Sequence, residues 1–300
     1  MRNRTDPSLS RIALTLRRAA GHDQSLMSLE PGPIFGDLAL ERAFRRDGWV
    51  VVDLLNADDI ARLARVFDDL AGVPAEPIYS SWSQALAVRA ATDEAIRSVT
   101  LPGLRALLPG CAMVFAGFMA KAVGPATAFP IHQDPTVVDE ARWTPLTFWI
   151  PLVDVGPETG CMQVIPGSHG LDASPRPAFR PFPHQHEDAR LRPLLRPIPM
   201  RAGQVMLSHP ALFHASTPNS GAGRRVACVG MVVPGDAEVR YYRRREEEAV
   251  IDVHPVPPGF YVRACPGDST DGLAVAARIH DRPPPLDFDA LVALAAGAAE

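Results

Sequence analysis

The chain has 300 residues, of which 47% are hydrophobic, and a formal net charge of −4 at pH 7. This length is enough for one large domain or two small ones, and the apolar fraction is that of a globular protein. The negative balance gives no basic field for a nucleic acid, which excludes nucleic-acid binding as a primary role. No apolar run approaches the roughly 18 residues of a membrane-spanning helix, so we expect no membrane partner.

Helix patterns dominate the first third of the chain and strand patterns dominate the rest. Asn56 is a good N-cap for the second of three helices with apolar residues at helical spacing. The predicted helices are residues 35–45, 57–70 and 92–108, the last broken at Pro102. The predicted strands are residues 49–55, 112–123, 147–155, 161–165, 203–208 and 225–233. Short strands between Gly and Pro turns predict a sandwich or barrel, with helices packed on one side.

Cysteine usage and the N-terminus bear on the compartment. The four cysteines show no C-x-x-C spacing and are Cys111, Cys161, Cys228 and Cys265. They indicate buried thiols in a reducing compartment, and we expect a cytoplasmic protein. The arginine-rich residues 1–20 lack the apolar core of a secretory signal. A frayed tail with one short helix is favoured over a transit peptide there, and residues 1–34 are predicted to be a mobile tail.

Three further segments have biased compositions. Residues 171–199 are rich in proline and too long for an ordinary connection, which is typical of functional or disordered segments. His184 and His186 within them resemble a metal pair, but no motif supplies further ligands, so a solvated loop is favoured. Residues 235–248 carry a block of arginines beside a block of glutamates, which indicates a solvated face or linker. Residues 286–299 predict a weak alanine-rich helix that packs on the core or on a partner chain, or frays.

The candidate metal ligands are a histidine and an aspartate in the stretch AFPIHQDP and a second histidine far downstream. His132 and Asp134 are two apart, so on an extended strand they point to one face and present a nitrogen beside a carboxylate oxygen. His214 completes two imidazoles and one carboxylate, the facial triad of non-haem iron(II) oxygenases. A lone His-x-Asp is weak evidence, and its alternative is a polar turn ahead of Pro135. The later histidine, followed by Asn219 and an arginine pair, strengthens the metal hypothesis.

Four motifs resemble, in the same order, those of one protein family. They are RDGWVVV at residues 46–52, FPIHQD at 129–134, TGCMQVIPGSH at 159–169 and GQVMLSHPALFHAS at 203–216. The family is the phytanoyl-CoA dioxygenase family of iron(II)/2-oxoglutarate-dependent oxygenases, and the resemblance covers about residues 40–235. It implies a double-stranded β-helix (jelly-roll, cupin-like), that is, an all-β core with flanking helices (α+β). It also implies Fe(II), 2-oxoglutarate and O2 as cofactor and co-substrates.

The same resemblance implies a domain organisation. We predict a single oxygenase domain over residues 35–265, preceded by the N-terminal tail and followed by a C-terminal extension over residues 266–300. Residues 171–199 fall between core strands, where the family often carries a segment that covers the site. They are therefore a candidate lid.

The resemblance further implies contacts for the co-substrate. The distal carboxylate of 2-oxoglutarate needs a fixed cation, and arginine provides two parallel charge-assisted bonds. Arg225 has the usual family offset from His214 and is preferred over Arg224, and only one of the two faces inward on a strand. The other candidates are Ser216, Trp149 and Lys121, whose alternatives are a turn serine, a core tryptophan and a surface lysine.

Three polar residues near these motifs are not assigned to the metal. Gln133 lies between two ligands and points to the opposite face of a strand. His169 is expected to stabilise its own turn or to rim the pocket. His209 is an odd number of positions from the ligand histidine, so it faces the other way on a regular strand.

The predicted activity is oxidation of a small-molecule substrate, in secondary or specialised metabolism. Hydroxylation of an unactivated C–H bond is coupled to decarboxylation of 2-oxoglutarate, with release of succinate and CO2. A halogenase of the same family needs space for chloride in place of the carboxylate, so Asp134 disfavours it. A non-catalytic metal-binding jelly roll is disfavoured by the complete ligand set, and a zinc hydrolase lacks a motif for a general base. The substrate, the choice between hydroxylation, desaturation and ring chemistry, and the oligomeric state carry no signal in the sequence.

Overall fold

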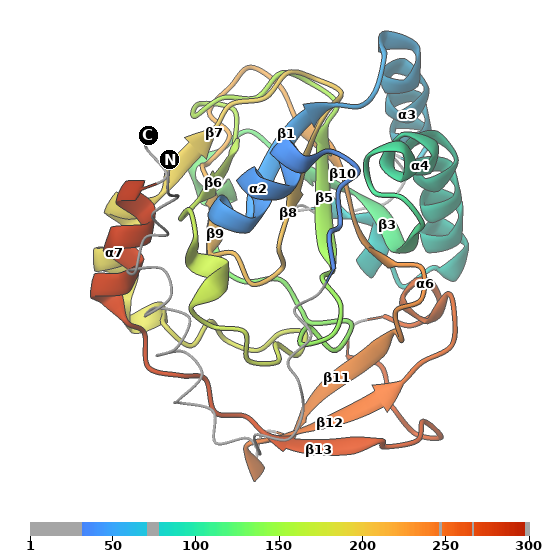
Figure 1. The fold of residues 1–300 in the computed structure, drawn as a ribbon. Coiled ribbons are helices and arrows are strands. Elements are labelled where there is room, and N and C mark those ends of the chain that lie inside the picture. The colour runs from blue at the N-terminus through green and yellow to red at the C-terminus, as the bar shows by residue number, and fades with distance from the viewer. Residues whose placement is uncertain (1–31, 71–77, 246–247, 266, 298–300) are drawn as a thin grey trace, which may run out of the picture. The chain divides into compact units, whose positions relative to one another are not determined.

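The computed structural model describes residues 32–70, 78–245, 248–265 and 267–297. Most of the predicted N-terminal tail therefore lies outside the described residues. The described part contains antiparallel sheets with flanking helices (Figure 1). No helix in it combines the length and the apolar character that crossing a bilayer requires. All four cysteines are buried as free thiols, as predicted.

Two sheets form the β-core. The six-stranded sheet contains, in spatial order, β1 (Trp49–Asp53), β8 (Gln204–Ser208), β5 (Leu146–Pro151), β10 (Arg225–Pro234), β3 (Cys111–Lys121) and β2 (Ile78–Tyr79). The four-stranded sheet contains β4 (Phe129–His132), β9 (His214–Ser216), β6 (Met162–Val164) and β7 (Arg196–Ile198). The chain alternates between the two sheets from β3 to β6 and again from β7 to β10, which is the path of a double-stranded β-helix. The predicted jelly-roll fold is confirmed.

Helices cover one face of the six-stranded sheet, as predicted. They are α2 (Leu38–Asp47), α3 (Ala57–Asp69) and α4 (Leu86–Leu107). Phe44, Leu63 and Ile96 from these helices are buried together with Phe118 and Phe148 of the sheet. Burial of such side chains contributes roughly 1.5–3 kcal/mol each.

The opposite face of the same sheet points toward the four-stranded sheet. Because side chains alternate along a strand, Trp149 lies on the other side of β5 from Phe148. Trp149, Met206 and Ala227 are buried with Cys161 and Val164, which belong to the second sheet or precede it. The space between the sheets is therefore where inward-facing residues of β5, β8 and β10 meet β6.

One predicted feature of the helices is confirmed and another is wrong. Asn56 caps α3 as predicted, since its side chain accepts hydrogen bonds from the backbone N–H groups of Asp58 (2.9 Å) and Asp59 (3.0 Å). The predicted break at Pro102 is wrong, because α4 runs through it. Buried Ile96 and Leu104 hold the helix to the core on both sides of the proline.

For residues 235–248 the linker prediction is wrong at residues 240–245, which form a strand, whereas most of the described side chains are at least partly exposed, as predicted for a solvated face. A three-stranded sheet consists of β11 (Arg240–Arg245), β12 (Val250–Pro255) and β13 (Ala277–His280). Arg244 pairs with Asp281 at 2.6 Å, and Arg245 pairs with Asp252 at 2.9 Å. Acidic residues of later segments thus neutralise the arginines, and the sequence pattern does not show this pairing.

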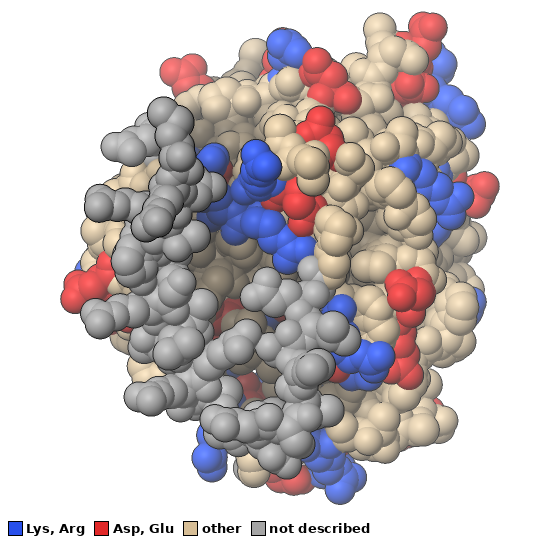
Figure 2. Space-filling model, viewed as in Figure 1, with Lys and Arg blue, Asp and Glu red and all other residues tan. Residues whose placement is uncertain are grey.

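Basic and acidic side chains also lie close together on the surface over α2 (Figure 2).

The proline-rich segment and the C-terminus carry more structure than their compositions suggest. Residues 171–199 contain η4 (Gln185–Glu187), α5 (Asp188–Leu191), η5 (Arg192–Leu194) and β7. The solvated-loop prediction is wrong for His184, which is buried with its Nε2 at 3.5 Å from Asp172 Oδ2, whereas His186 is exposed. The predicted C-terminal helix is present as α7 (Phe288–Gly297), and its Leu291 is buried beside Phe213. The short helix α6 (Phe260–Arg263) precedes β13.

Candidate metal and co-substrate site

Three side chains with metal-ligating atoms converge where β4 and β9 pair. His132 and His214 are direct partners in the strand register, and their ring centroids lie 4.1 Å apart. Asp134 Oδ1 lies 3.7 Å from His214 Nε2 and 4.0 Å from His132 Nε2. One ligand atom of each residue lies within 4.8 Å of the others, and no second such group occurs among the residues that the structure describes.

Both imidazoles are held in the orientation that a metal ligand needs. His132 Nδ1 lies 2.9 Å from the carbonyl oxygen of Pro130, and His214 Nδ1 lies 2.9 Å from that of Leu212. A carbonyl only accepts, so each Nδ1 carries a proton, and the neutral form of each ring has its lone pair on Nε2. Burial, followed by the nearby His214, lowers the pKa of His132 to about 4. The ring is therefore neutral near pH 7.

The carboxylate reaches the histidines from a loop. β4 ends at His132, so the expectation that one extended strand carries both ligands is wrong for Asp134. The loop is fixed by the Asp134 N–H, which donates to the carbonyl of Pro210 at 2.8 Å. Thr147 Oγ1 donates to Asp134 Oδ2 at 2.8 Å, which leaves Oδ1 directed at the two imidazoles.

Arg176 of the proline-rich segment lies against this loop and is almost completely buried. Its Nε donates to the carbonyl oxygen of Asp134 at 2.9 Å. Its backbone N–H donates to Thr136 Oγ1 at 3.0 Å, and the Thr136 N–H donates back to the Arg176 carbonyl at 2.9 Å. The guanidinium also pairs with the buried carboxylate of Glu140. Neither Arg176 nor Thr147 stood out in the sequence, because each contacts Asp134 only through the folded chain.

A pair of buried cations lies on the neighbouring sheet. Lys121 and Arg225 are direct cross-strand partners in β3 and β10, and only 5% and 1% of their surfaces are exposed. Like charges opposite each other destabilise a sheet unless an anion compensates them. Nε, Nη1 and Nη2 of Arg225 make no hydrogen bond within the described chain. Among those residues, no carboxylate forms an ion pair with either cation.

The lysine of this pair is the more strongly perturbed. Lys121 Nζ donates to Ser216 Oγ at 2.6 Å and to the carbonyl oxygen of Thr217 at 2.7 Å. Burial, reinforced by the charge of Arg225, lowers the pKa of Lys121 to about 7. Burial likewise lowers the pKa of Arg225, to about 10. Both shifts follow from burial of positive charge, which no carboxylate of the described chain compensates here.

A glycine keeps space open beside the two cations. A Cβ atom on Gly160 would lie 3.0 Å from Lys121 Cδ and 3.6 Å from Arg225 Nε. The φ angle of Gly160 is +78°, in the left-handed region that other residues avoid. A side chain at this position would therefore be strained and would crowd the side chain of Lys121.

The other predicted contacts take the following places. Trp149 is buried, and its ring centroid lies 5.1 Å from Arg225 Cζ, within range of a cation–π contact. Ser216 is buried and bonded to Lys121 as described above. Arg224 is exposed, as strand alternation predicts for the neighbour of an inward-facing residue. Lys121 is not the surface lysine of the alternative interpretation.

The polar residues that the sequence did not assign to the metal lie away from it. Gln133 points in another direction, and its Nε2 donates to the carbonyl of Ala211 at 2.9 Å. His169 and His209 lie beside Phe44 of α2, each ring 6.4 Å from the phenyl ring. Burial lowers the pKa of each of these histidines to about 3, so they are neutral packing residues.

Tyr79 contacts Phe129, the aromatic residue that lies against His132. Burial raises the pKa of its hydroxyl to about 12, with opposing contributions from the charges of Arg225 and Asp134. The tyrosine is thus within electrostatic reach of both groups. It belongs to the short strand β2, which pairs with β3.

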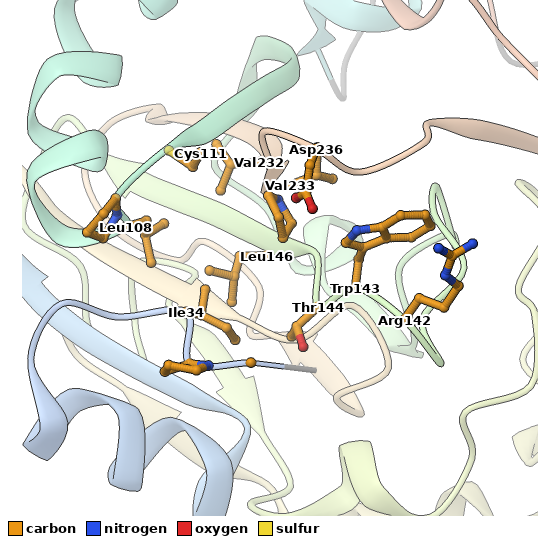
Figure 3. Close-up of a pocket in the computed structure, with 14 residues that line it drawn as sticks. Ile34, Leu108, Cys111, Arg142, Trp143, Thr144, Leu146, Val232, Val233 and Asp236 are labelled. Atoms are coloured by element: carbon orange, nitrogen blue, oxygen red, sulfur yellow. The ribbon is translucent and has the colours of Figure 1, made fainter. Parts of the chain in front are cut away.

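A separate cavity of about 290 Å³ lies elsewhere in the molecule (Figure 3). Ile34, Leu146 and Val232 contribute apolar side chains to it, and Arg142 and Asp236 contribute charged ones. None of the three candidate metal ligands and neither buried cation lines it. We therefore do not assign the chemistry of the site to this cavity.

Comparison with known proteins agrees with the geometry. The family model described as Phytanoyl-CoA dioxygenase (PhyH) matches residues 44–227, which include the three candidate ligands and both cations. No curated protein matches the chain significantly.

Several solved structures resemble the chain. SnoK, a non-heme alpha ketoglutarate dependent carbocyclase from nogalamycin biosynthesis, is 20% identical with a TM-score of 0.53, covering 80% of this chain and 97% of its own. This similarity shows a common fold. SnoN, an epimerase from the same biosynthesis, is 24% identical with a TM-score of 0.49, covering 80% of this chain and 93% of its own. HygX from Streptomyces hygroscopicus, solved with nickel and 2-oxoglutarate, is 15% identical with a TM-score of 0.48, covering 67% of this chain and 88% of its own.

Proposed function

Because the chain belongs to the phytanoyl-CoA dioxygenase (PhyH) family, we propose that it is an iron(II)/2-oxoglutarate-dependent oxygenase acting on a small molecule. The reaction is hydroxylation, or another oxidation, at an unactivated C–H bond. The pair of buried, uncompensated cations beside a two-histidine, one-carboxylate cluster carries this proposal. The fold shared with SnoK, from nogalamycin biosynthesis, favours a substrate of specialised metabolism.

The donor set suits iron(II). His132 Nε2, His214 Nε2 and Asp134 Oδ1 would hold the ion on one face and leave other positions for the co-substrates. When bound, iron and 2-oxoglutarate supply the oxygen-activating chemistry, with succinate and CO2 as the products of the co-substrate. Thr147 holds one carboxylate oxygen of Asp134 and Arg176 holds its backbone carbonyl, so the other carboxylate oxygen would face the ion.

The cation pair suits a dicarboxylate. An unpaired guanidinium in a protein interior is costly, so a buried arginine without a partner indicates a missing anion. Arg225 would bind the distal carboxylate of 2-oxoglutarate, and Lys121 and Ser216 would complete its hydrogen bonds. Gly160 leaves the space for this group, and Trp149 closes the pocket against the Arg225 side chain.

A halogenase is the disfavoured alternative. It needs an open position where the carboxylate ligand stands, whereas Asp134 is present and its second oxygen is held by Thr147. The same retained ligand and the buried cations also disfavour a non-catalytic metal-binding role. Formation of succinate distinguishes an active oxygenase from such a protein.

The test is anaerobic addition of Fe(II) and 2-oxoglutarate to the purified chain. We expect the weak visible charge-transfer band of a chelated 2-oxo acid, loss of that band in Asp134→Ala, and a requirement for much more 2-oxoglutarate in Arg225→Met. Arg224→Met is the matched control and should behave as wild type. Absence of the band from the wild-type protein, or an unchanged band in Asp134→Ala, contradicts the proposal.

A further inference from the structure

A continuous series of aromatic side chains begins at a candidate metal ligand and ends at the surface. The ring centroid of Phe129 lies 4.6 Å from that of His132, and Tyr79 lies 6.4 Å from Phe129. Trp82 stacks on Tyr79 with centroids 4.6 Å apart and an interplanar angle of 22°. Phe179 meets Trp82 nearly edge-on, with centroids 5.5 Å apart.

The outer end of this series is open to a ligand. Trp82 and Phe179 are 46% and 62% exposed, although large aromatic side chains usually bury most of their surface. An exposed apolar patch that leads to a polar site is typical of ligand-binding surfaces.

The backbone holds Phe179 in place at an energetic cost. Its φ angle is +62°, and Ala249 is the one other non-glycine residue with positive φ in the described part of the chain. A bulky residue in the left-handed region is a strained outlier, and such strain is concentrated at functional positions. The flanks are anchored, since Arg176 pairs with Glu140 and Arg180 Nη2 lies 2.9 Å from Asp281 Oδ1.

The charged side chains near Phe179 are not available to recognise a charged substrate. The two arginines that flank Phe179 are already paired with acids. In the proposed function, Lys121 and Arg225 are committed to the co-substrate. What remains along the series, within the described residues, is four aromatic rings, the Tyr79 hydroxyl and the Trp82 indole N–H, which fit a neutral planar ligand.

We propose that Tyr79, Trp82, Phe129 and Phe179 form an aromatic platform that binds a flat, uncharged aromatic ring system of the substrate by stacking. One end of the substrate lies on Trp82 and Phe179, and the carbon to be oxidised extends past Phe129 toward the metal ligands. This placement rests on the proposed function, whereas the stacking itself does not. Aromatic pairs gain energy beyond the area that they bury, so the platform distinguishes an aromatic ring from a saturated ring of the same size.

The test uses 2-naphthylmethanol and its fully saturated analogue, decahydro-2-naphthylmethanol, as probes of the full-length protein. Dissociation constants are measured by saturation-transfer NMR. We expect the naphthyl probe to bind at least fivefold more tightly than the saturated one. Trp82→Ala should raise the dissociation constant of the naphthyl probe three- to tenfold, and Trp82→Phe should change it by less than twofold. Val153 is an exposed apolar residue outside the platform, so Val153→Ala should leave this constant unchanged.

Phe179→Gly separates binding from structural damage. Glycine adopts positive φ without strain, so the thermal midpoint of unfolding should not fall, while affinity for the naphthyl probe falls three- to tenfold. Equal affinity for the two probes, or unchanged naphthyl binding in both Trp82→Ala and Phe179→Gly, overturns the platform. If Trp82→Ala does not fold, the platform is still tested by Trp82→Phe, by Phe179→Gly and by the comparison of the two probes.

The direction of the platform is tested with Mn(II) bound in place of iron. Paramagnetic relaxation of the naphthyl protons should appear with Mn(II) and disappear after chelation. Probe binding without any relaxation effect overturns the placement toward the metal. If probe binding and relaxation behave as expected but the charge-transfer band with 2-oxoglutarate is absent, the proposed function fails and the platform stands.

Discussion

Two cross-strand pairs, one on each sheet, show different electrostatics. His132 and His214 on β4 and β9 lie beside Asp134, and each Nδ1 has a backbone partner. Lys121 and Arg225 on β3 and β10 are two buried cations, and the arginine has no hydrogen-bond partner in the described chain. The first pair is oriented by the protein alone, whereas the second is incomplete until an anion binds. The predictions below test that difference.

Removal of a metal ligand should have the largest effect. Asp134→Ala takes away the anionic ligand and should lower the rate of succinate formation at least about a thousandfold, equivalent to roughly 4 kcal/mol of activation free energy. Iron content after anaerobic loading measures the cause directly. Wild-type iron content in this variant would show that the ion is held elsewhere.

Removal of the Arg225 guanidinium should affect binding of the co-substrate and leave the metal ligands unaffected. Arg225→Met should raise the KM for 2-oxoglutarate about a hundredfold, because a buried charge-assisted contact is lost, while iron affinity is retained. The ligand-free variant should be more stable to unfolding than wild type by about 1–2 kcal/mol, since an uncompensated buried charge is removed. Thermal unfolding with and without 2-oxoglutarate measures both effects, with Arg224→Met as the control. Destabilisation of the ligand-free variant would contradict the idea that this cation is uncompensated.

Loss of the hydrogen bond that orients the carboxylate should have an intermediate effect. Thr147→Val keeps the shape of the side chain but frees Asp134 Oδ2, and metal affinity should fall about tenfold. Competition with a metal-sensitive dye measures this change. Thr100→Val is the matched control, because Thr100 is also buried but donates to the Ile96 carbonyl of α4, so it should alter stability without altering metal affinity.

The smallest effect is the pH dependence that Lys121 should give. Its pKa is about 7 in the ligand-free folded chain and 10.5 without perturbation, so the dianionic co-substrate favours the protonated form. Affinity for 2-oxoglutarate should therefore be highest below pH 7 and fall as pH rises through 7, with a three- to tenfold rise in KM between about pH 6.5 and 8. Stability of the ligand-free protein should instead increase with pH between about 7 and 10, because the unfolded chain binds the proton more tightly. Lys121→Met should abolish both trends, and persistence of either trend in this variant assigns it to another group.

The sequence predicted those parts of the site that depend on local spacing. The family offset from His214 favoured Arg225 over Arg224, and strand alternation required that only one of the two face inward, as the structure shows. The motifs named His132 and His214 together, although their pairing on adjacent strands was not predicted. The jelly-roll core followed from short strands between turns, together with the family resemblance. The metal and co-substrate roles of these residues remain predictions.

The sequence did not predict contacts that form only through folding. Thr147 and Arg176 reach Asp134 across 13 and 42 positions, and neither lies in a motif. α4 continues through Pro102 because buried residues on both sides outweigh the lost backbone hydrogen bond. The arginines of β11 pair with Asp252 and Asp281, which come later in the chain, so the charge blocks of residues 240–248 did not show these ion pairs.

The position of Arg176, three residues before Phe179, has a consequence for engineering. One short stretch holds both the residue that fixes the loop of Asp134 and an outer ring of the aromatic platform. Grafting the whole stretch from a relative would exchange selectivity and disturb the metal ligand at the same time. A library that varies residues 177–179 and retains Arg176 and Arg180 would change substrate selectivity without disturbing the loop that carries Asp134.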